Sequence, residues 1–311
     1  MKALVTGGAG FIGGHLTDRL VADGYQVRVL DNLSNQPRPT YDSARYVDFV
    51  LGDVRDKDAC KYALRGVDVV FHLAALTSVQ RSILDPVSCH DVNVTGTLNI
   101  LMASREARAQ RVVLASSSSV YGDSPELPKR ETMTPQPVSP YALSKLTGEY
   151  YAQQFYQHYA LETVSLRYFN VFGAGQNPKC DYAAVIPRFV TAARSGDRPV
   201  IFGDGEQTRD FIAVQNVVDA TVLAGESRSA PGRTYNIGSG EGLSLNRLVE
   251  EIGGIVGRRI QPVYGPPRRG DIRHSVADIE AAERELRWGP RVSVARALEE
   301  LLGPARMLRA A

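Results

Sequence analysis

A glycine-rich turn near the start of the chain constrains the fold more than any other sequence feature. Residues 3–5 are a short apolar run that predicts a buried strand, and a helical apolar pattern begins at Leu16. Between them stand Gly7, Gly10 and Gly13, a spacing different from the commoner Gly-x-Gly-x-x-Gly. Such glycines permit a tight turn and close approach of the backbone to a pyrophosphate, which the helix N-terminus attracts. Strand, turn and helix together predict a dinucleotide site.

An acidic residue after the next expected strand indicates which dinucleotide binds. Residues 26–30 predict a strand, and Asp31 follows it directly. A carboxylate there can accept hydrogen bonds from an adenosine ribose, and its charge would repel a 2′-phosphate. The pattern therefore favours NAD over NADP, with Arg38 the nearest basic residue that could oppose this. The alternative is a strand-terminal turn formed by Asp31 and Asn32.

Two further strands are expected before residue 76. Residues 47–51 lead into Asp53, which could bind the adenine edge or cap the following helix. Residues 67–73 lead into Ala74 and Ala75, whose small side chains would let a ligand pass close to the backbone.

Strands alternate with helical patterns throughout the first half of the chain, and residues 111–115 are another buried strand. This alternation predicts an α/β fold, a Rossmann-type doubly wound parallel sheet with helices on both faces. Beyond Tyr168 the pattern loosens, and proline and glycine become frequent. We therefore expect residues 1–170 to form an NAD-binding domain, to which 205–225 return, and 171–311 to form mainly a smaller substrate-binding region.

A tyrosine and a lysine share a helix expected to begin near Pro140. Tyr141 and Lys145 stand four positions apart, so phenol and ammonium emerge on one face. Lowering the pKa of a phenol from about 10 to about 7 requires roughly 4 kcal/mol of preferential phenolate stabilisation, part of which a nearby cation can supply. The serines at 116–119 follow a strand end, where doubly wound sheets bind ligands. The alternative is an amphipathic helix with a chance Tyr/Lys pair.

Composition excludes several functional classes. The 311 residues carry a formal net charge of +2, which argues against a dedicated nucleic-acid or membrane surface. The cysteines, Cys60, Cys89 and Cys180, form no Cys-x-x-Cys and predict no disulfide framework. His72 has no partner at ligand spacing, so we expect a packed residue and no metal site. Without a signal segment or an apolar run of about 18 residues, the sequence predicts a soluble, cytoplasmic protein.

Five motifs occur in order along the chain. They are Thr-Gly-Gly-Ala-Gly-Phe-Ile-Gly from Thr6, serines before Val-Tyr-Gly, Tyr-x-x-x-Lys, Leu-Arg-Tyr-Phe-Asn-Val-Phe-Gly from Leu166, and Thr-Arg-Asp-Phe-Ile from Thr208. The set resembles the extended short-chain dehydrogenase/reductases, and within them the UDP-sugar 4-epimerases, from Met1 to about Leu302. The resemblance implies NAD as cofactor, a UDP-sugar as substrate and a transient 4-keto sugar.

The resemblance also assigns roles to residues. Tyr141 would take the proton of the sugar O4 hydroxyl, Ser117 would hydrogen-bond that hydroxyl, and Lys145 would lower the tyrosine pKa and bond the nicotinamide ribose. The residues matched to NAD are Gly7, Gly10, Phe11, Ile12, Gly13, Asp31, Asn32, Asp53, Val54, Leu73, Ala74, Ala75, Asn93, Tyr141, Lys145 and Tyr168. Those matched to the UDP-sugar are Ser78, Ser117, Ser118, Tyr141, Asn170, Val185, Arg209, Arg268, Asp271 and Ser275. For Arg209 the alternative is an ion pair with Asp210 or another acid.

Ser275 carries the expectation about substrate choice. Family members restricted to UDP-glucose and UDP-galactose typically have a bulky tyrosine at the matching position, and serine leaves space for an N-acetyl group. The resemblance therefore implies interconversion of UDP-GlcNAc and UDP-GalNAc, with UDP-Glc and UDP-Gal alongside. The alternatives are a UDP-glucose 4-epimerase only, a UDP-glucuronate 4-epimerase, a nucleotide-sugar dehydratase and a non-catalytic NAD-sensing protein.

Family members usually dimerise through two long helices of each subunit, which here are residues 91–108 and 141–159. The resemblance thus implies a homodimer. Four apolar residues of these helices could instead belong to the core: Leu98, Leu101, Tyr151 and Phe155.

Overall fold

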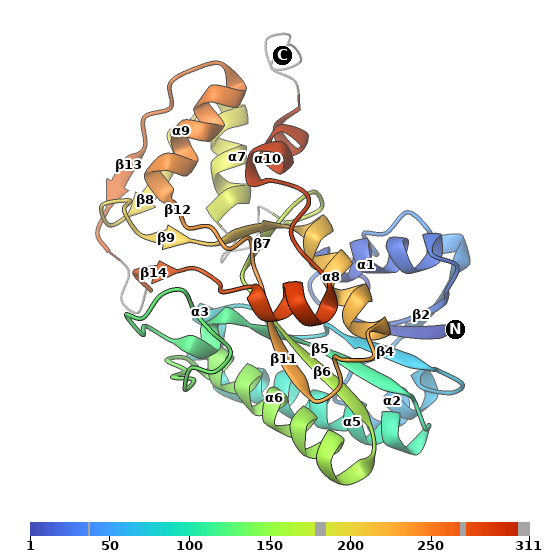
Figure 1. Cartoon of the computed structure of the whole chain (residues 1–311). Coiled ribbons are helices and arrows are strands. Elements are labelled where there is room, and N and C mark those ends of the chain that lie inside the picture. The colour runs from blue at the N-terminus through green and yellow to red at the C-terminus, as the bar shows by residue number, and fades with distance from the viewer. Residues whose placement is uncertain (37, 178–184, 268–271, 304–311) are drawn as a thin grey trace.

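The computed structural model describes residues 1–36, 38–177, 185–267 and 272–303, and its main element is a sheet of seven strands in the order β11-β6-β5-β4-β1-β2-β3 (Figure 1). All neighbouring strands of this sheet are parallel. The strands are β1 (Lys2–Thr6), β2 (Gln26–Asp31), β3 (Val47–Leu51), β4 (Val69–His72), β5 (Arg111–Ser117), β6 (Glu162–Tyr168) and β11 (Arg233–Ile237). The predicted α/β, doubly wound fold is confirmed.

Helices cover both faces of the sheet because its central strands are apolar on both sides. Alternate residues of a strand point to opposite faces, and Val5 and Leu4 accordingly belong to two different cores. The helices over Val5 are α1 (Phe11–Ala22) and α8 (Val214–Glu226), and those over Leu4 are α2 (Lys57–Ala63), α5 (Gly96–Glu106) and α6 (Pro140–Tyr159).

Short helical elements connect the sheet to these layers. Pro86 occupies the first turn of α4, and Asp85 caps that turn by accepting a hydrogen bond from the Ser88 N–H at 3.0 Å. The short elements are η1 (Ala44–Tyr46), α3 (Val79–Leu84), α4 (Pro86–His90), the π-helical turn η2 (Asp91–Thr95), the 3₁₀ turn η3 (Ser118–Tyr121) and the π-helical turn η4 (Ala282–Leu286).

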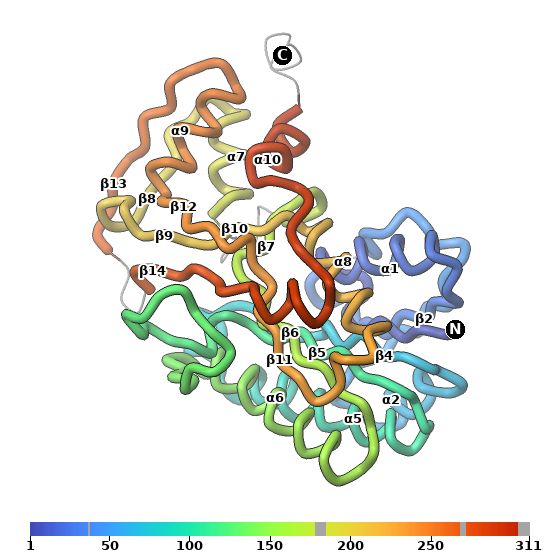
Figure 2. The backbone as a smooth tube through the Cα atoms, viewed as in Figure 1, coloured from blue at the N-terminus to red at the C-terminus, as the bar shows by residue number. Residues whose placement is uncertain are grey.

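A smaller group of elements lies beside the carboxyl end of the sheet, where β7 follows β6 after one residue (Figure 2). Its helices share an apolar core that includes Phe189, Leu248 and Leu298. The helices are α7 (Val185–Ser195), α9 (Leu245–Val256) and α10 (Val294–Leu302). The strands form three small sheets, β7 (Asn170–Phe172) with β10 (Phe211–Ala213), β8 (Val200–Phe202) with β13 (Val263–Gly265), and β12 (Leu243–Ser244), β9 (Thr208–Arg209) and β14 (His274–Ser275).

Two segments of the second half pack with the large sheet. α8 covers β4, β5 and β6, and β11 pairs with β6. The sequence pattern does not predict β11 as a strand of this sheet, because its apolar run is short and is flanked by proline and glycine. The expected division into residues 1–170 with 205–225, and 171–311, stays a prediction. In the part of the chain that the structure describes, no helix combines the length and the apolar character needed to cross a bilayer.

His72 is a buried polar link between strand and helix. Its Nδ1 lies 2.7 Å from Thr6 Oγ1 on β1, and its Nε2 lies 3.0 Å from Thr97 Oγ1 on α5. Burial lowers the pKa of His72 to about 3, because the interior disfavours the charged imidazolium. His72 is therefore a packed residue, as the sequence predicts.

Acid should destabilise the fold through His72. Between pH 6.5 and about pH 3 the unfolded chain binds a proton at this imidazole and the folded chain does not. The free energy of unfolding therefore decreases as the pH is lowered through this range. His72→Gln keeps a group that can bond both threonines but cannot titrate. Between pH 7 and pH 4.5 the native chain should lose about 2 kcal/mol more than the variant in urea unfolding. Equal losses would contradict this role.

Candidate active site

The glycine-rich turn joins β1 to α1 in a conformation that side chains would obstruct. Gly7 has a φ of +71°, and a Cβ on it would lie 2.7 Å from the Ala74 nitrogen. A Cβ on Gly13 would overlap the Gly7 carbonyl oxygen. The turn therefore requires glycine at these positions, and only glycine leaves its backbone open to a ligand.

The first turn of α1 suits an anion. Gly10 is the N-cap residue and offers no side-chain acceptor, and Phe11 and Ile12 begin the helix. The N–H groups at a helix start carry partial positive charge and need partners. A backbone cradle of glycines followed by such a helix start fits the pyrophosphate of a dinucleotide.

Asp31 is bonded to the glycine turn. Its Oδ2 accepts a hydrogen bond from the Ala9 N–H at 3.0 Å, and its Oδ1 accepts one from the Leu33 N–H at 2.8 Å. The alternative of a strand-terminal turn is thus present in the structure. Binding of a ribose by the same carboxylate stays a prediction.

Asp53 stands beside Asp31 at the carboxyl end of the next strand. Side-chain hydrogen bonds from Arg55 are the main cause that lowers the Asp53 pKa to about 2, and Asn32 Nδ2 donates to Asp53 Oδ2 at 2.7 Å. The alternative that Asp53 caps the next helix is wrong, because Asp56 is the N-cap of α2. Val54, which follows, is buried and directs its carbonyl to Asn99 Nδ2 at 3.0 Å.

Asn93 holds the loop that follows β4. Its Oδ1 accepts from the Leu76 N–H at 2.7 Å, while its Nδ2 donates to the Leu76 carbonyl at 3.0 Å and to Ser144 Oγ on α6 at 2.9 Å. The π-helical turn η2 places this side chain between loop and helix. Asn93 therefore positions the segment that contains the predicted cofactor residues Leu73, Ala74 and Ala75.

Three predicted catalytic side chains meet at the end of β5. Ser117 ends that strand, and its hydroxyl lies near enough to the phenol of Tyr141, on the first turn of α6, to lower the tyrosine pKa. Lys145, one turn further on, donates from Nζ to the Ala115 carbonyl of β5 at 2.7 Å. Ser139 caps α6 by accepting from the Ala142 N–H at 3.1 Å. Helix and strand end are thus held together at the reacting groups.

Burial opposes charge on both groups of the helix. It raises the pKa of Tyr141, and the nearby Ser117 hydroxyl partly opposes this rise. It lowers the pKa of Lys145 to about 8, a fall that Cys89 and Glu149 oppose. The expected lowering of the tyrosine pKa by Lys145 is not among the causes of its shift. At neutral pH Lys145 is thus mainly protonated and Tyr141 keeps its proton.

Tyr168 borders this centre through the sheet. It ends β6 in register with Ser117 of β5. Its hydroxyl, however, is bonded to Thr221 Oγ1 of α8 at 2.7 Å, so the polar end of this side chain is used for packing.

The predicted sugar-binding residues Arg209 and Ser275 are neighbours in space. They face each other in the parallel pair of β9 and β14, although 66 positions separate comparable residues of these strands. Ser275 is buried. Arg209 Nη1 donates to the Thr208 carbonyl at 2.9 Å. The Asp210 carboxylate accepts from Ser239 Oγ at 2.8 Å and from the Ala277 and Gly240 N–H groups, so it holds three loops together.

The other predicted sugar-binding residues lie at element ends. Asn170 begins β7, Val185 begins α7, and Ser118 begins η3. Ser78 caps α3 by accepting from the Arg81 N–H at 3.1 Å. Arg268 and Asp271 lie outside the described residues.

The motifs of the sequence do not point to Glu149 and Arg167, which form a buried ion pair behind Ser117. Two sequence signals could have found the pair. Glu149 stands one helical turn after Lys145, and Arg167 is a charged residue within an apolar strand, which needs a buried partner.

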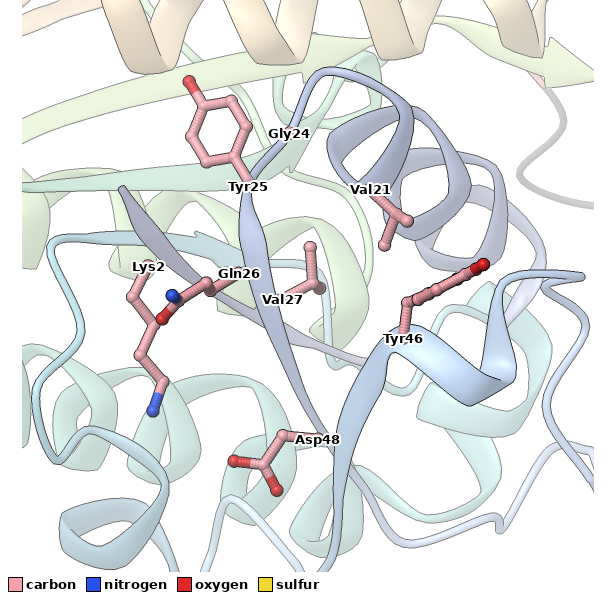
Figure 3. A pocket seen from close by; sticks show the side chains of 8 residues that line it. All are labelled: Lys2, Val21, Gly24, Tyr25, Gln26, Val27, Tyr46 and Asp48. Atoms are coloured by element: carbon pink, nitrogen blue, oxygen red, sulfur yellow. The ribbon is translucent and has the colours of Figure 1, made fainter.

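A pocket at the other end of the sheet is separate from this centre (Figure 3). Lys2 and Gln26 on its wall begin β1 and β2, whereas the glycine turn follows the end of β1. Its lining residues are Lys2, Val21, Gly24, Tyr25, Gln26, Val27, Tyr46 and Asp48.

Known proteins match the whole chain. Residues 3–238 match the model of the NAD dependent epimerase/dehydratase family. A UDP-glucose 4-epimerase of Mycolicibacterium smegmatis is 41% identical and covers 95% of each chain. The structure of a UDP-N-acetylglucosamine 4-epimerase from Methanobrevibacter ruminantium M1, with UDP-N-acetylmuramic acid, is 37% identical with a TM-score of 0.90 over 97% of this chain and 96% of that one. The UDP-glucose 4-epimerase of Thermotoga maritima, with UDP-glucose, is 36% identical with a TM-score of 0.93 over 99% of both chains.

The family match covers the glycine turn, Ser117, Tyr141 and Lys145 in one continuous segment. The backbone cradle before α1 fits the dinucleotide that this family uses. The chain therefore belongs to the NAD dependent epimerase/dehydratase family, and its cofactor is NAD.

Proposed function

We propose that this chain interconverts UDP-hexoses at C4 of the sugar, using NAD and passing through a transient 4-keto sugar. The observation that carries the proposal is the meeting of Ser117, Tyr141 and Lys145 at the carboxyl end of β5. Full-length relatives that are named UDP-sugar 4-epimerases support it.

The chain's own residues handle the proton of the reaction. When bound, NAD supplies a reversible hydride acceptor for the sugar C4. Tyr141 would act in its phenolate form, accepting the O4 proton as C4 is oxidised and returning it when C4 is reduced on the opposite face. Ser117, whose hydroxyl lies near the phenol, would orient the O4 hydroxyl. Lys145, fixed to β5, would supply a positive charge that favours the phenolate form of Tyr141 before the proton is transferred.

The UDP group has to anchor the substrate, because a sugar that exposes both faces in turn cannot be held tightly itself. Arg209 and Asn170 lie on β9 and β7, at the border between the large sheet and the smaller region. A guanidinium pairs well with a diphosphate through its planar fork. Arg268 and Asp271 would contribute from the segment outside the described residues.

We infer that the site accepts a sugar with either a hydroxyl or an N-acetyl group at C2. Ser275 is small, buried and paired with Arg209, which places it beside the proposed anchor. Ser78 and Ser118 would bond the acetamido group or neighbouring hydroxyls. One relative is named for UDP-glucose and another for UDP-N-acetylglucosamine, which supports a pocket that accepts both.

Replacing Tyr141 tests the proposed chemistry. Tyr141→Phe removes the hydroxyl that transfers the proton, so turnover of UDP-Gal and UDP-GlcNAc should fall by about 10²- to 10⁴-fold while bound NAD is retained. NMR of the UDP-sugar products and release of NAD on denaturation measure the two effects. Tyr156→Phe, at a half-exposed tyrosine on the same helix, is the control. Unchanged turnover in Tyr141→Phe would remove this residue from the mechanism.

Enlarging Ser275 tests substrate choice. Ser275→Tyr should fill the space beside C2 and lower kcat/KM for UDP-GlcNAc at least about tenfold relative to UDP-Glc. Initial rates with four UDP-hexoses, followed by mass spectrometry and NMR, give this ratio. A native enzyme that turned over UDP-Gal but not UDP-GlcNAc would contradict the proposed breadth.

We also propose that the chain forms a homodimer through α6 and its neighbours. Leu101 and Phe155 are buried in the core, which excludes them from the contact, whereas Leu98 and Tyr151 are only partly buried against that core. Leu143 and Tyr150, seven positions apart on α6, are 55% and 56% exposed. Leu84 of α3 and Val87 of α4 are more exposed still, and both helices contact α6.

A charge on this face should dissociate the dimer. Leu143→Asp would place a carboxylate in the apolar contact, and light scattering at micromolar concentration should then give the mass of a monomer. Val263→Asp, on β13 in the smaller region, should leave the mass unchanged (Figure 1). A native chain of monomer mass would overturn the proposal.

A further inference from the structure

A buried ion pair lies directly behind the proposed proton-handling centre. Glu149 of α6 accepts three bonds from Arg167 of β6, Nε to Oε1 at 2.9 Å, Nε to Oε2 at 3.2 Å and Nη2 to Oε2 at 2.7 Å, and both side chains are 5% exposed. The same Oε1 accepts a hydrogen bond from the hydroxyl of Ser116, the residue before Ser117. Glu149 also stands one turn after Lys145. The pair therefore touches both elements that carry the reacting groups.

Two further side chains extend the pair across the sheet. Arg167 Nη1 donates to the Tyr121 hydroxyl at 2.9 Å, and that hydroxyl donates to Asn236 Oδ1 on β11 at 2.6 Å. Tyr121 and Asn236 are almost fully buried. Asn236 Nδ2 donates to the carbonyls of Lys129 at 2.7 Å and Asp278 at 3.1 Å. Every polar group of this chain of contacts has a partner.

The far end of the network is the segment that follows Ser275. Lys129 donates from its N–H to the Val276 carbonyl at 2.7 Å, and the Asp278 N–H donates to the Lys129 carbonyl at 2.8 Å. Between them, the Ala277 N–H donates to the Asp210 carboxylate at 3.0 Å. Movement of this segment relative to β5 would thus break buried hydrogen bonds.

Packing alone does not explain these side chains. A buried ion pair costs several kcal/mol to desolvate, and apolar residues of similar volume often give equal or greater stability. Hydrogen bonds between polar groups fix the relative positions of the elements that they join, because each bond holds only over a narrow range of distance and angle. Arginine is needed here, since lysine cannot bond both carboxylate oxygens and a hydroxyl with one planar group.

We propose that Glu149, Arg167, Tyr121 and Asn236 form a positioning network that keeps Ser117 and α6 in fixed register with the segment after Ser275. The proposal rests on the proposed function of that site. The network holds the proton-handling side chains and the sugar-recognising segment in one geometry, although they come from distant parts of the chain. None of the four residues is assigned a contact with substrate or cofactor.

Glu149 has a second, electrostatic effect. It faces the ammonium of Lys145, as do the thiol of Cys89 on α4 and the neutral imidazole of His72 on β4. The carboxylate favours the protonated amine, whose pKa burial lowers to about 8. Loss of this charge would lower the Lys145 pKa further and leave Arg167 without its counter-charge.

Tyr121→Phe interrupts the network in the middle without changing any charge. Tyr235→Phe is the matched control, because Tyr235 lies on β11 beside Asn236, is equally buried and donates to Glu285 Oε2 at 2.9 Å, outside the network. Both variants should lose similar stability in urea unfolding. Tyr121→Phe should lower kcat for UDP-Gal about tenfold with KM changed less than about twofold, whereas Tyr235→Phe should keep the native kcat. Equal kcat values in the two variants would overturn the proposal.

Hydrogen exchange tests the network without reference to turnover. The amides of Lys129 and Asp278 should exchange at least about tenfold faster in Tyr121→Phe than in Tyr235→Phe. Native turnover with unchanged exchange in Tyr121→Phe would reject the network alone. Absence of any UDP-hexose turnover by the native chain would reject the proposed function, and the exchange rates would then decide the network by themselves.

Glu149→Gln gives a pH signature that a packing defect would not produce. Because loss of the Glu149 charge lowers the Lys145 pKa further, the alkaline limb of the kcat profile should move to lower pH. Tyr121→Phe, which keeps both charges, should leave this limb in place. A limb that does not move in Glu149→Gln would remove the electrostatic part of the proposal.

Discussion

The parallel pairing of β1, β4, β5 and β6 is the constraint on which the rest of the structure depends. In a parallel sheet all carboxyl ends lie on one edge, so the turns that leave them meet there. The glycine turn after β1, the loop after β4 and Ser117 at the end of β5 thereby become neighbours, and Lys145 attaches α6 to the same edge through the Ala115 carbonyl. This edge is where the proposed chemistry would occur, because side chains pack both faces of the sheet.

Burial of Tyr141 and Lys145 disfavours the charged form of both side chains. Burial raises the pKa of Tyr141 and lowers that of Lys145, and both shifts oppose the charged pair that proton transfer from a sugar would require. Two neighbouring groups partly offset these shifts. The Ser117 hydroxyl lowers the pKa of Tyr141, and the Glu149 carboxylate raises that of Lys145. Glu149 is itself balanced by Arg167, so the centre contains no unpaired buried carboxylate. A polar centre of this kind needs neighbouring elements that cannot shift.

The smaller region is attached to the edge of the large sheet by hydrogen bonds as much as by apolar contact. Asp210 accepts bonds from two segments, one with Ser239 and Gly240 and the other with Ala277, and Asn236 of β11 donates to the carbonyls of Lys129 and Asp278. These bonds surround β9 and β14, which carry Arg209 and Ser275. A region built from strands of two or three residues has few ladder hydrogen bonds of its own, so buried side chains have to define its geometry.

The sequence by itself determined the α/β sheet, the glycine turn, the helix that begins at Pro140 and the pairing of Tyr141 with Lys145. Each depends on backbone restrictions or spacings that act within a few residues, so no distant partner is needed to recognise it. Only the tertiary structure decided that Asp56 and not Asp53 caps α2, that Asn93 clamps the loop after β4, that Ser275 pairs with Arg209, and that Glu149 meets Arg167. Those relations join residues that are remote in the chain, and they arise from how strands and helices pack, which local pattern does not encode.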